Sequence, residues 1–335
     1  MKFIAVFVMR FTLFLLPFSF FGCAPCFAAL KIGLVLDKGG KDDKSFNAAA
    51  YEGAMKAQKD FGVELKYVEA TDINAFENLH RSFARKDFDL VIAIGFAQSE
   101  AVQKIAAQYP NKKFALVDGE VKASNVRSLL FEEHEGSYLV GAIAALKAGS
   151  NKVGFIGGMD IPLIRRFEMG YIAGVKKINP KAEVVSNFIG VTAEAWNNPA
   201  KAKELALSQY ASGVDVIFVA AGASGVAVFD AAEEKNKLAI GVDSNQNWMK
   251  PGFVLTSMLK RVDVAVYDAI KDVKDGKFTG GTVRFGLKNK GVDFAVDQYN
   301  QKLLTPEILK KTDEIKSQII SGKIQVPDYY KKNAK

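Results

Sequence analysis

From residue 30 onward, short apolar runs bounded by turn residues alternate with stretches of helical periodicity. This alternation predicts parallel β-sheets with helices on both faces, because parallel strands need long crossover connections. The expected strands lie at 31–37, 63–69, 89–95, 113–118, 126–131, 152–157, 183–189, 214–220, 238–242 and 253–257. The expected helices lie near 46–61, 75–86, 98–109, 134–148, 162–177, 199–212, 224–235, 261–276 and 305–321.

Ten strands are many for one sheet, so the α/β pattern favours two similar sheets of about five strands each. The chain is expected to leave the first lobe near Glu132–Glu133, to return near Thr256–Leu259 and to leave again around 287–297. The first lobe would then comprise residues 30–132 and 259–290, and the second lobe residues 133–258 and 291–335.

The first 29 residues differ in character from the rest of the chain. Lys2 and Arg10 precede an almost wholly apolar run at 11–21, and small residues follow this run. That order is typical of a secretory signal peptide, which a peptidase removes. We therefore expect residues 1–29 to be a signal peptide and the mature protein to be periplasmic.

Both cysteines of the chain, Cys23 and Cys26, lie inside this leader. Its removal would leave a mature chain without disulfides or thiol chemistry. The sequence Phe20-Phe-Gly-Cys23 weakly resembles a lipoprotein cleavage site, so a lipid anchor at Cys23 is the alternative to a free periplasmic protein.

The charge pattern argues against a nucleic-acid partner. The formal net charge of +8 falls by two when Lys2 and Arg10 are removed, and the other lysines are scattered mostly among acidic residues. A basic stripe with interleaved aromatic residues, which a nucleic-acid-binding surface would need, is not found in the sequence.

Three aspartates follow expected strands, namely Asp37, Asp118 and Asp243. The carboxyl ends of parallel strands meet at one edge of a sheet, where α/β proteins bind their ligands. A single aspartate after a strand is often a turn or cap residue. Three of them on separate strands favour a shared site.

Aromatic, amide and cationic residues follow the same strand ends. Phe46 and Asn47 begin the helix after the first strand, while Trp196 and Lys260 follow two later strands. Ionised carboxylates accept hydrogen bonds from hydroxyls, and aromatic rings suit the flat face of a base or sugar. These residue types together predict a site for a small polar molecule with a flat face.

Competing chemistries have weaker support. The loop Gly40-Lys-Asp-Asp-Lys-Ser45 lacks the glycine that precedes the Lys-Ser pair of a phosphate-binding loop, and its aspartates would repel phosphate. With only His80 and His134 as histidines, we expect neither a metal nor a cofactor, and we assign both to structural roles. No Ser-His-Asp set can be proposed.

Several motifs spread over the mature chain carry a family resemblance. They are Asp42-Asp-Lys-Ser-Phe-Asn47, Tyr51-Glu-Gly53, Gly154-Phe-Ile-Gly-Gly-Met-Asp-Ile-Pro162, Phe167-Glu-Met-Gly-Tyr171, Ala220-Ala-Gly222, Gly241-Val-Asp243 and Ser257-Met-Leu-Lys260. Together they resemble the basic membrane protein family of ABC-transporter substrate-binding proteins, and the chain is similar to the purine nucleoside receptor group.

The resemblance implies a type I periplasmic-binding-protein fold, in which two doubly wound parallel-sheet lobes are joined by a three-segment hinge. It implies a purine nucleoside as the ligand and an ABC permease of the inner membrane as the partner, and we expect a monomer. Carried over position by position, it implies ligand contacts at Asp37, Phe46, Asn47, Asp118, Gly222, Asp243 and Lys260. We expect Phe46 to stack on the purine opposite Trp196.

We also expect Asp243 and Lys260 to act as a pair on the ribose, because neighbouring strand ends lie about 5 Å apart.

The preferred function is a binding protein that closes around a nucleoside and performs no reaction. One alternative is a nucleoside hydrolase that uses the same aspartates, although such an enzyme would normally cluster a metal with them. Another is a binding protein for a free sugar.

Overall fold

The computed structural model describes residues 1–5, 29–70 and 72–332 of the 335-residue chain. Residues 6–28 of the expected signal peptide at 1–29, including Cys23, therefore lie outside the described residues. Within the described part of the chain, no helix combines the length and the apolar character that a bilayer crossing requires.

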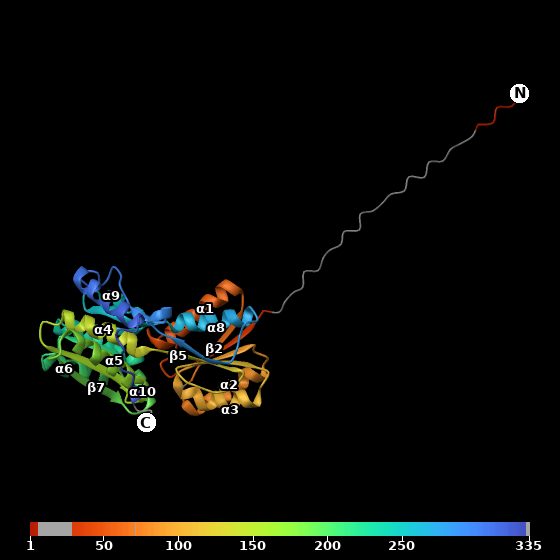
Figure 1. Ribbon diagram of the computed structural model, residues 1–335. Helices are drawn as coiled ribbons and strands as arrows, with labels where there is room; N and C mark the ends of the chain where they lie inside the picture. Colours follow the sequence, from red (N-terminus) through yellow and green to blue (C-terminus); the bar gives the residue numbers. More distant parts are fainter. Residues whose placement is uncertain (6–28, 71, 333–335) are drawn as a thin grey trace.

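Two six-stranded sheets form the centres of two lobes (Figure 1). The first sheet has the order β11-β5-β4-β3-β1-β2, and every neighbouring pair in it is parallel. Its strands are β1 (Lys31–Leu36), β2 (Glu64–Glu69), β3 (Leu90–Ile94), β4 (Lys113–Val117), β5 (Val126–Phe131) and β11 (Gly281–Phe285). β3 is buried at every position, as expected for a strand with helices on both faces of its sheet.

The second sheet has the order β12-β10-β9-β8-β6-β7, with β12 antiparallel to β10 and the other pairs parallel. Its strands are β6 (Lys152–Met159), β7 (Glu183–Gly190), β8 (Val216–Ala220), β9 (Leu238–Asp243), β10 (Val254–Lys260) and β12 (Val292–Phe294). The predicted α/β architecture of two largely parallel sheets is confirmed.

One edge strand of each sheet was not predicted. Four of the five residues of β11 are exposed, and β12 contains three residues, so neither carries a long buried apolar run. With these strands included, the chain passes between the two sheets three times, after β5, after β10 and after β11.

Helices cover both faces of each sheet. In the first lobe, α1 (Phe46–Phe61) packs against α8 (Val262–Lys274) on one face, and α2 (Phe76–Arg85) packs against α3 (Ser99–Gln108) on the other. The second lobe carries α4 (Glu133–Lys147), α5 (Pro162–Ile178), α6 (Pro199–Ala211), α7 (Val226–Lys235), α9 (Pro306–Ile320) and α10 (Tyr329–Lys332). Three of these helices begin with proline, whose missing N–H suits a first helical turn.

α4 and α5 cross at a very short distance because glycines form the contact. A Cβ atom added to Gly141, Gly170 or Gly174 would lie between 2.0 and 2.3 Å from a backbone oxygen of the facing helix. Any larger residue would push the two helices apart. This contact fixes the first turn of α4 against α5, next to the hinge between the lobes.

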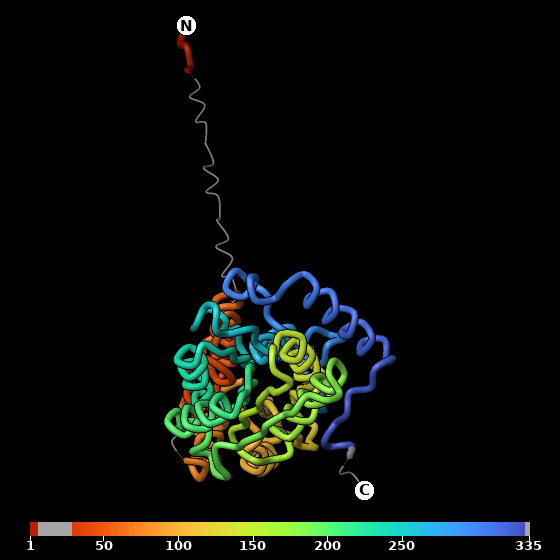
Figure 2. The backbone as a smooth tube through the Cα atoms, turned by 90° about the vertical axis from the view of Figure 1, so that its left-hand side faces the viewer, coloured from red at the N-terminus to blue at the C-terminus, as the bar shows by residue number. Residues whose placement is uncertain are grey.

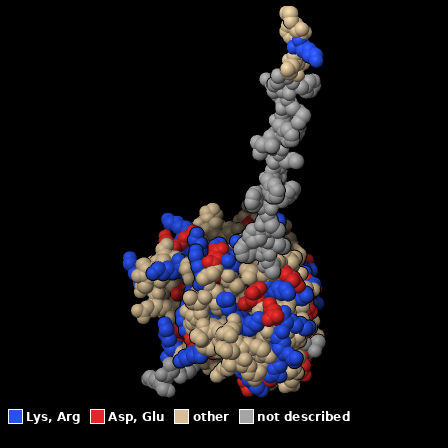
Figure 3. All heavy atoms as spheres, turned by 90° about the vertical axis from the view of Figure 1, so that its right-hand side faces the viewer, with Lys and Arg blue, Asp and Glu red and all other residues tan. Residues whose placement is uncertain are grey.

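The surface carries charges of both signs. Lys and Arg side chains are interspersed with Asp and Glu over the face seen in Figure 3. Exposed ion pairs of the described chain include Lys56 with Asp60 and Lys201 with Glu204.

Candidate functional site

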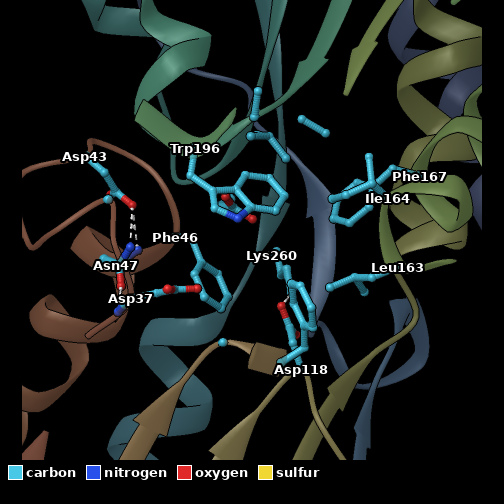
Figure 4. Close-up of a pocket in the computed structure, with 18 residues that line it drawn as sticks. Asp37, Asp43, Phe46, Asn47, Asp118, Leu163, Ile164, Phe167, Trp196 and Lys260 are labelled. Atoms are coloured by element: carbon cyan, nitrogen blue, oxygen red, sulfur yellow. Dashed lines mark hydrogen bonds and ion pairs between the residues drawn. The ribbon is translucent and has the colours of Figure 1, made fainter. Parts of the chain in front are cut away.

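A cavity lies between the lobes at the carboxyl ends of both sheets, and it contains about 610 Å³ that protein atoms do not fill, open mouth included. All eight residues predicted for the site line this one cavity (Figure 4): Asp37, Phe46, Asn47, Asp118, Trp196, Gly222, Asp243 and Lys260.

The loop after β1 is held by hydrogen bonds around Asp43. Its carboxylate accepts from the backbone N–H groups of Asn47 and Ala48 at 2.9 and 3.0 Å, and so caps the start of α1. The Asn47 amide donates to Asp43 at 3.0 Å, and its oxygen accepts from the Asp37 N–H at 2.9 Å. Burial and the nearby charge of Asp43 raise the pKa of Asp37. A hydrogen bond from the Lys38 N–H lowers the pKa and partly offsets this rise.

Asp118 follows β4 with a φ of 65°, a left-handed conformation that turns its side chain into the hinge region. One carboxylate oxygen, Oδ2, accepts from Lys260 Nζ at 2.5 Å. The other, Oδ1, is buried and has no hydrogen-bond partner among the described residues. Burial raises the pKa of Asp118, against the lowering effect of Lys260. This oxygen is therefore a buried acceptor that no donor among the described residues satisfies.

Lys260, the last residue of β10, is almost completely buried. Besides Asp118, its ammonium contacts Glu133 Oε1 at 3.1 Å. Aromatic rings surround the same nitrogen, with the centroids of Phe46 and Phe131 at 5.1 Å and that of Phe167 at 5.6 Å. Burial alone would lower the pKa of Lys260, but the nearby carboxylates, led by Asp118, raise it, so the side chain stays charged.

The expected ion pair between Asp243 and Lys260 is not formed. Asp243 Oδ2 instead accepts from Ser45 Oγ of the first lobe at 2.5 Å, while Lys260 contacts Asp118 and Glu133. The strand register explains the difference, because Asp243 pairs with Leu259 and side chains alternate between the two faces of a strand. Burial raises the pKa of Asp243 to about 6.

Two aromatic rings enter the cavity from different lobes, as Figure 4 shows. Phe46 comes from the first turn of α1, and Trp196 comes from a short 3-10 helix, Ala193–Asn197, after β7. Gly158 makes room for the indole, since a Cβ atom there would lie 2.2 Å from Trp196. Phe167 of α5 approaches from the opposite wall.

Contacts across the cavity mouth hold the lobes together. Besides the bond between Ser45 and Asp243, Ser244 Oγ donates to the backbone oxygen of Ser45 at 3.0 Å. Gln246 Nε2 donates to the Lys44 carbonyl at 2.9 Å. Lys38 of the first lobe forms an ion pair with Glu194 of the second. The structure therefore represents a closed arrangement of the two lobes.

Sequence reasoning missed several residues of this site. Phe167, Leu163 and Ile164 of α5 line the cavity, and Glu133 of α4 contacts Lys260 from behind. These residues lie on helices rather than at strand ends, so the strand-end pattern did not select them. The motif that begins at Phe167 could have indicated a site residue, but no role in ligand binding was predicted for it.

Among the described residues, one group has the spacing of metal ligands, namely Glu132, His134 and Asp328. A guanidinium already binds its carboxylates, since Arg166 donates to Glu132 at 2.7 Å and to Asp328 at 2.7 Å. The group therefore holds a protein cation, and none of its members lines the cavity. His80 is likewise a core residue, with Nε2 2.8 Å from Gln98 Oε1 and a pKa that burial lowers to about 4.

Comparisons with known proteins agree with the fold. The Bmp family model, described as ABC transporter substrate-binding protein PnrA-like, matches residues 30–329. The ABC transporter nucleoside-binding protein BmpA of Lactococcus lactis subsp. cremoris is 36% identical over 321 residues, which cover 89% of each chain. An uncharacterised lipoprotein of Pyrococcus abyssi is 35% identical over 278 residues, covering 79% of this chain and 69% of that protein.

Solved structures show the same relationship. The crystal structure of an ABC transporter solute-binding protein from Aeropyrum pernix K1 matches with a TM-score of 0.83 at 31% identity. The match covers 89% of this chain and 94% of that chain, so it includes both lobes.

Proposed function

Because the chain belongs to the Bmp family of PnrA-like ABC transporter substrate-binding proteins, we propose that it captures purine nucleosides between its two lobes. The family is one of binding proteins rather than enzymes, and its members bind a small molecule for an ABC permease. The observation that carries the nucleoside proposal is one cavity that combines aromatic rings with a buried carboxylate oxygen that has no partner in the described part of the chain.

The buried polar groups define what the ligand must supply. The free oxygen of Asp118 needs a hydrogen-bond donor, and leaving a buried acceptor unsatisfied is costly. Asp37 and Asp243 add further acceptors to the same cavity. Ribose hydroxyls and the N–H groups of a purine are donors of the required kind.

The aromatic rings define a second requirement. Phe46 and Trp196 enter from different lobes, so a flat ring held between them would be covered only when the lobes close. In this binding mode the purine stacks against Phe46 and Trp196, and the ribose faces the carboxylates. Ligand contacts on both lobes then favour the closed over the open arrangement.

Calorimetry with inosine, hypoxanthine and ribose tests the proposal. We expect inosine to bind at least about tenfold more tightly than either fragment, because each fragment lacks one of the two sets of contacts. Ribose binding as tight as that of inosine would favour the free-sugar alternative. Free hypoxanthine released from inosine during incubation would favour the hydrolase alternative.

We further propose that the mature protein is a periplasmic monomer that begins near residue 29. Mass spectrometry of protein from its native host should then find Ala29 or Leu30 at the N-terminus, and light scattering should give the mass of one chain. The Pyrococcus abyssi relative is named a lipoprotein. A lipid on Cys23 would accordingly replace the free periplasmic form with an anchored one.

A further inference from the structure

A continuous series of buried charges runs from the cavity to the C-terminal segment. Asp118 contacts Lys260, and Lys260 contacts Glu133 Oε1. The second oxygen of Glu133 accepts from Arg166 Nη1 at 2.6 Å. Arg166 Nε in turn donates to Asp328 Oδ1 at 2.7 Å. Three carboxylates thus alternate with two cations between the ligand site and the end of the chain.

All five side chains of this series are between 1% and 6% exposed. Water screens charges that are buried to this degree only weakly, and removing one member leaves its neighbour with fewer charge partners. Each member therefore depends on the next one for its position. Glu133 links the two halves, because its two oxygens face different cations.

Arg166 joins the series to the hinge as well as to the C-terminal segment. Its Nη1 donates to the carbonyl of Phe131, the last residue of β5, at 2.6 Å, and its Nη2 donates to Glu132 at 2.7 Å. The ring centroid of Tyr330 lies 4.9 Å from the guanidinium. Figure 2 shows the C-terminal segment descending along the second lobe after α9, and α10 packs against α5.

We propose that residues 326–330 are part of the ligand-binding apparatus, with Asp328 as a positioning residue for Lys260 and Asp118. Without Asp328, the remaining carboxylate partners of Arg166 are Glu132 and Glu133. The guanidinium then draws Glu133 away from Lys260. The ammonium of Lys260 turns toward the free oxygen of Asp118, which is the acceptor that the ligand needs.

The test compares Asp328→Asn with Asp215→Asn as a matched control. Asp215 also accepts from a cation, Lys237, and from a backbone N–H, that of Ser150, but it precedes β8 at the opposite end of the second sheet. The inference rests on the proposed function for its probe, inosine. We expect Asp328→Asn to weaken inosine binding about three- to tenfold in calorimetry, and Asp215→Asn to change it less than about twofold.

A second readout needs no ligand and separates the inference from the proposed function. A lysine-selective NMR spectrum of the ammonium groups, with the Lys260 signal assigned from Lys260→Arg, should shift in Asp328→Asn and not in Asp215→Asn. If wild-type protein does not bind inosine but the Lys260 signal shifts in Asp328→Asn, the nucleoside proposal fails and the coupling between Asp328 and Lys260 stands.

The conservative variant Asp328→Glu keeps the charge but displaces the carboxylate, so it should cause a smaller loss of inosine affinity and a smaller shift of the Lys260 signal than Asp328→Asn. It also serves as the reporter if Asp328→Asn does not fold, because the displaced carboxylate should then give a smaller shift of the same signal. A folded Asp328 variant with unchanged inosine affinity and an unchanged Lys260 signal would overturn the inference.

Discussion

Replacing Asp118 with asparagine should weaken ligand binding strongly while leaving the fold intact. Asparagine is close to aspartate in shape, and Lys260 keeps Glu133 as a carboxylate partner at 3.1 Å. The raised pKa of Asp118 indicates that burial disfavours its charged form in the folded protein. Removing this charge should therefore lower the free energy of unfolding only slightly.

The binding loss follows from the free carboxylate oxygen. Asp118 Oδ1 has no partner among the described residues, so a ligand donor would form its hydrogen bond to a charged acceptor there. Hydrogen bonds to charged groups contribute about 1.5–3 kcal/mol, which corresponds to roughly a ten- to hundredfold loss of affinity.

Calorimetry with inosine on wild-type protein and Asp118→Asn measures this difference. Asp293→Asn is the matched control, because Asp293 forms an ion pair with Lys316 at 2.5 Å and lies outside the cavity lining. We expect the control to bind inosine as wild-type protein does. Wild-type affinity in a folded Asp118→Asn variant would refute the assignment of the free oxygen to the ligand.

Three further predictions concern the same cavity. Phe46→Ala should weaken inosine binding about ten- to hundredfold in a folded protein, because aromatic stacking contributes about 1–3 kcal/mol per base; unchanged affinity would make Phe46 a core residue. Burial raises the pKa of Asp243 to about 6, so protonation of this group should lower inosine affinity about tenfold between pH 7 and pH 5; Asp243→Asn should reduce the pH dependence, and Asp118, whose pKa burial also raises, should account for the dependence that remains. The raised pKa of Asp243 favours the folded state at low pH and loses that contribution as pH rises through 6, so unfolding through this group does not cause the fall. Inosine monophosphate should bind at least about a hundredfold more weakly than inosine, because a phosphate would meet several carboxylates while Lys260 is already paired; equal affinities would contradict this reasoning.

The strand-end pattern predicted the centre of the site because parallel strands place their carboxyl ends along one edge. Asp37, Asp118 and Asp243 are far apart in the sequence, yet this single geometric rule brings them to one cavity. The same reasoning predicted the two-sheet architecture, since apolar runs and helical periodicity alternate along nearly the whole chain.

The strand-end pattern did not predict the side chains that contact these residues. Glu133 and Phe167 lie on α4 and α5, whose close crossing depends on glycine contacts between helices that sequence periodicity does not encode. Lys260 contacts Asp118 rather than Asp243. This pairing depends on the strand register and on the contact that Lys260 of the second lobe makes with Asp118 of the first. Tertiary packing, and not local sequence preference, decides both.

A crystal structure of the protein grown with inosine tests the central claim most directly. The account predicts the purine between Phe46 and Trp196, with a ligand donor within hydrogen-bond distance of the Asp118 oxygen that Lys260 does not contact. Inosine bound in the cavity with that oxygen uncontacted, or bound elsewhere on the protein, would contradict the account.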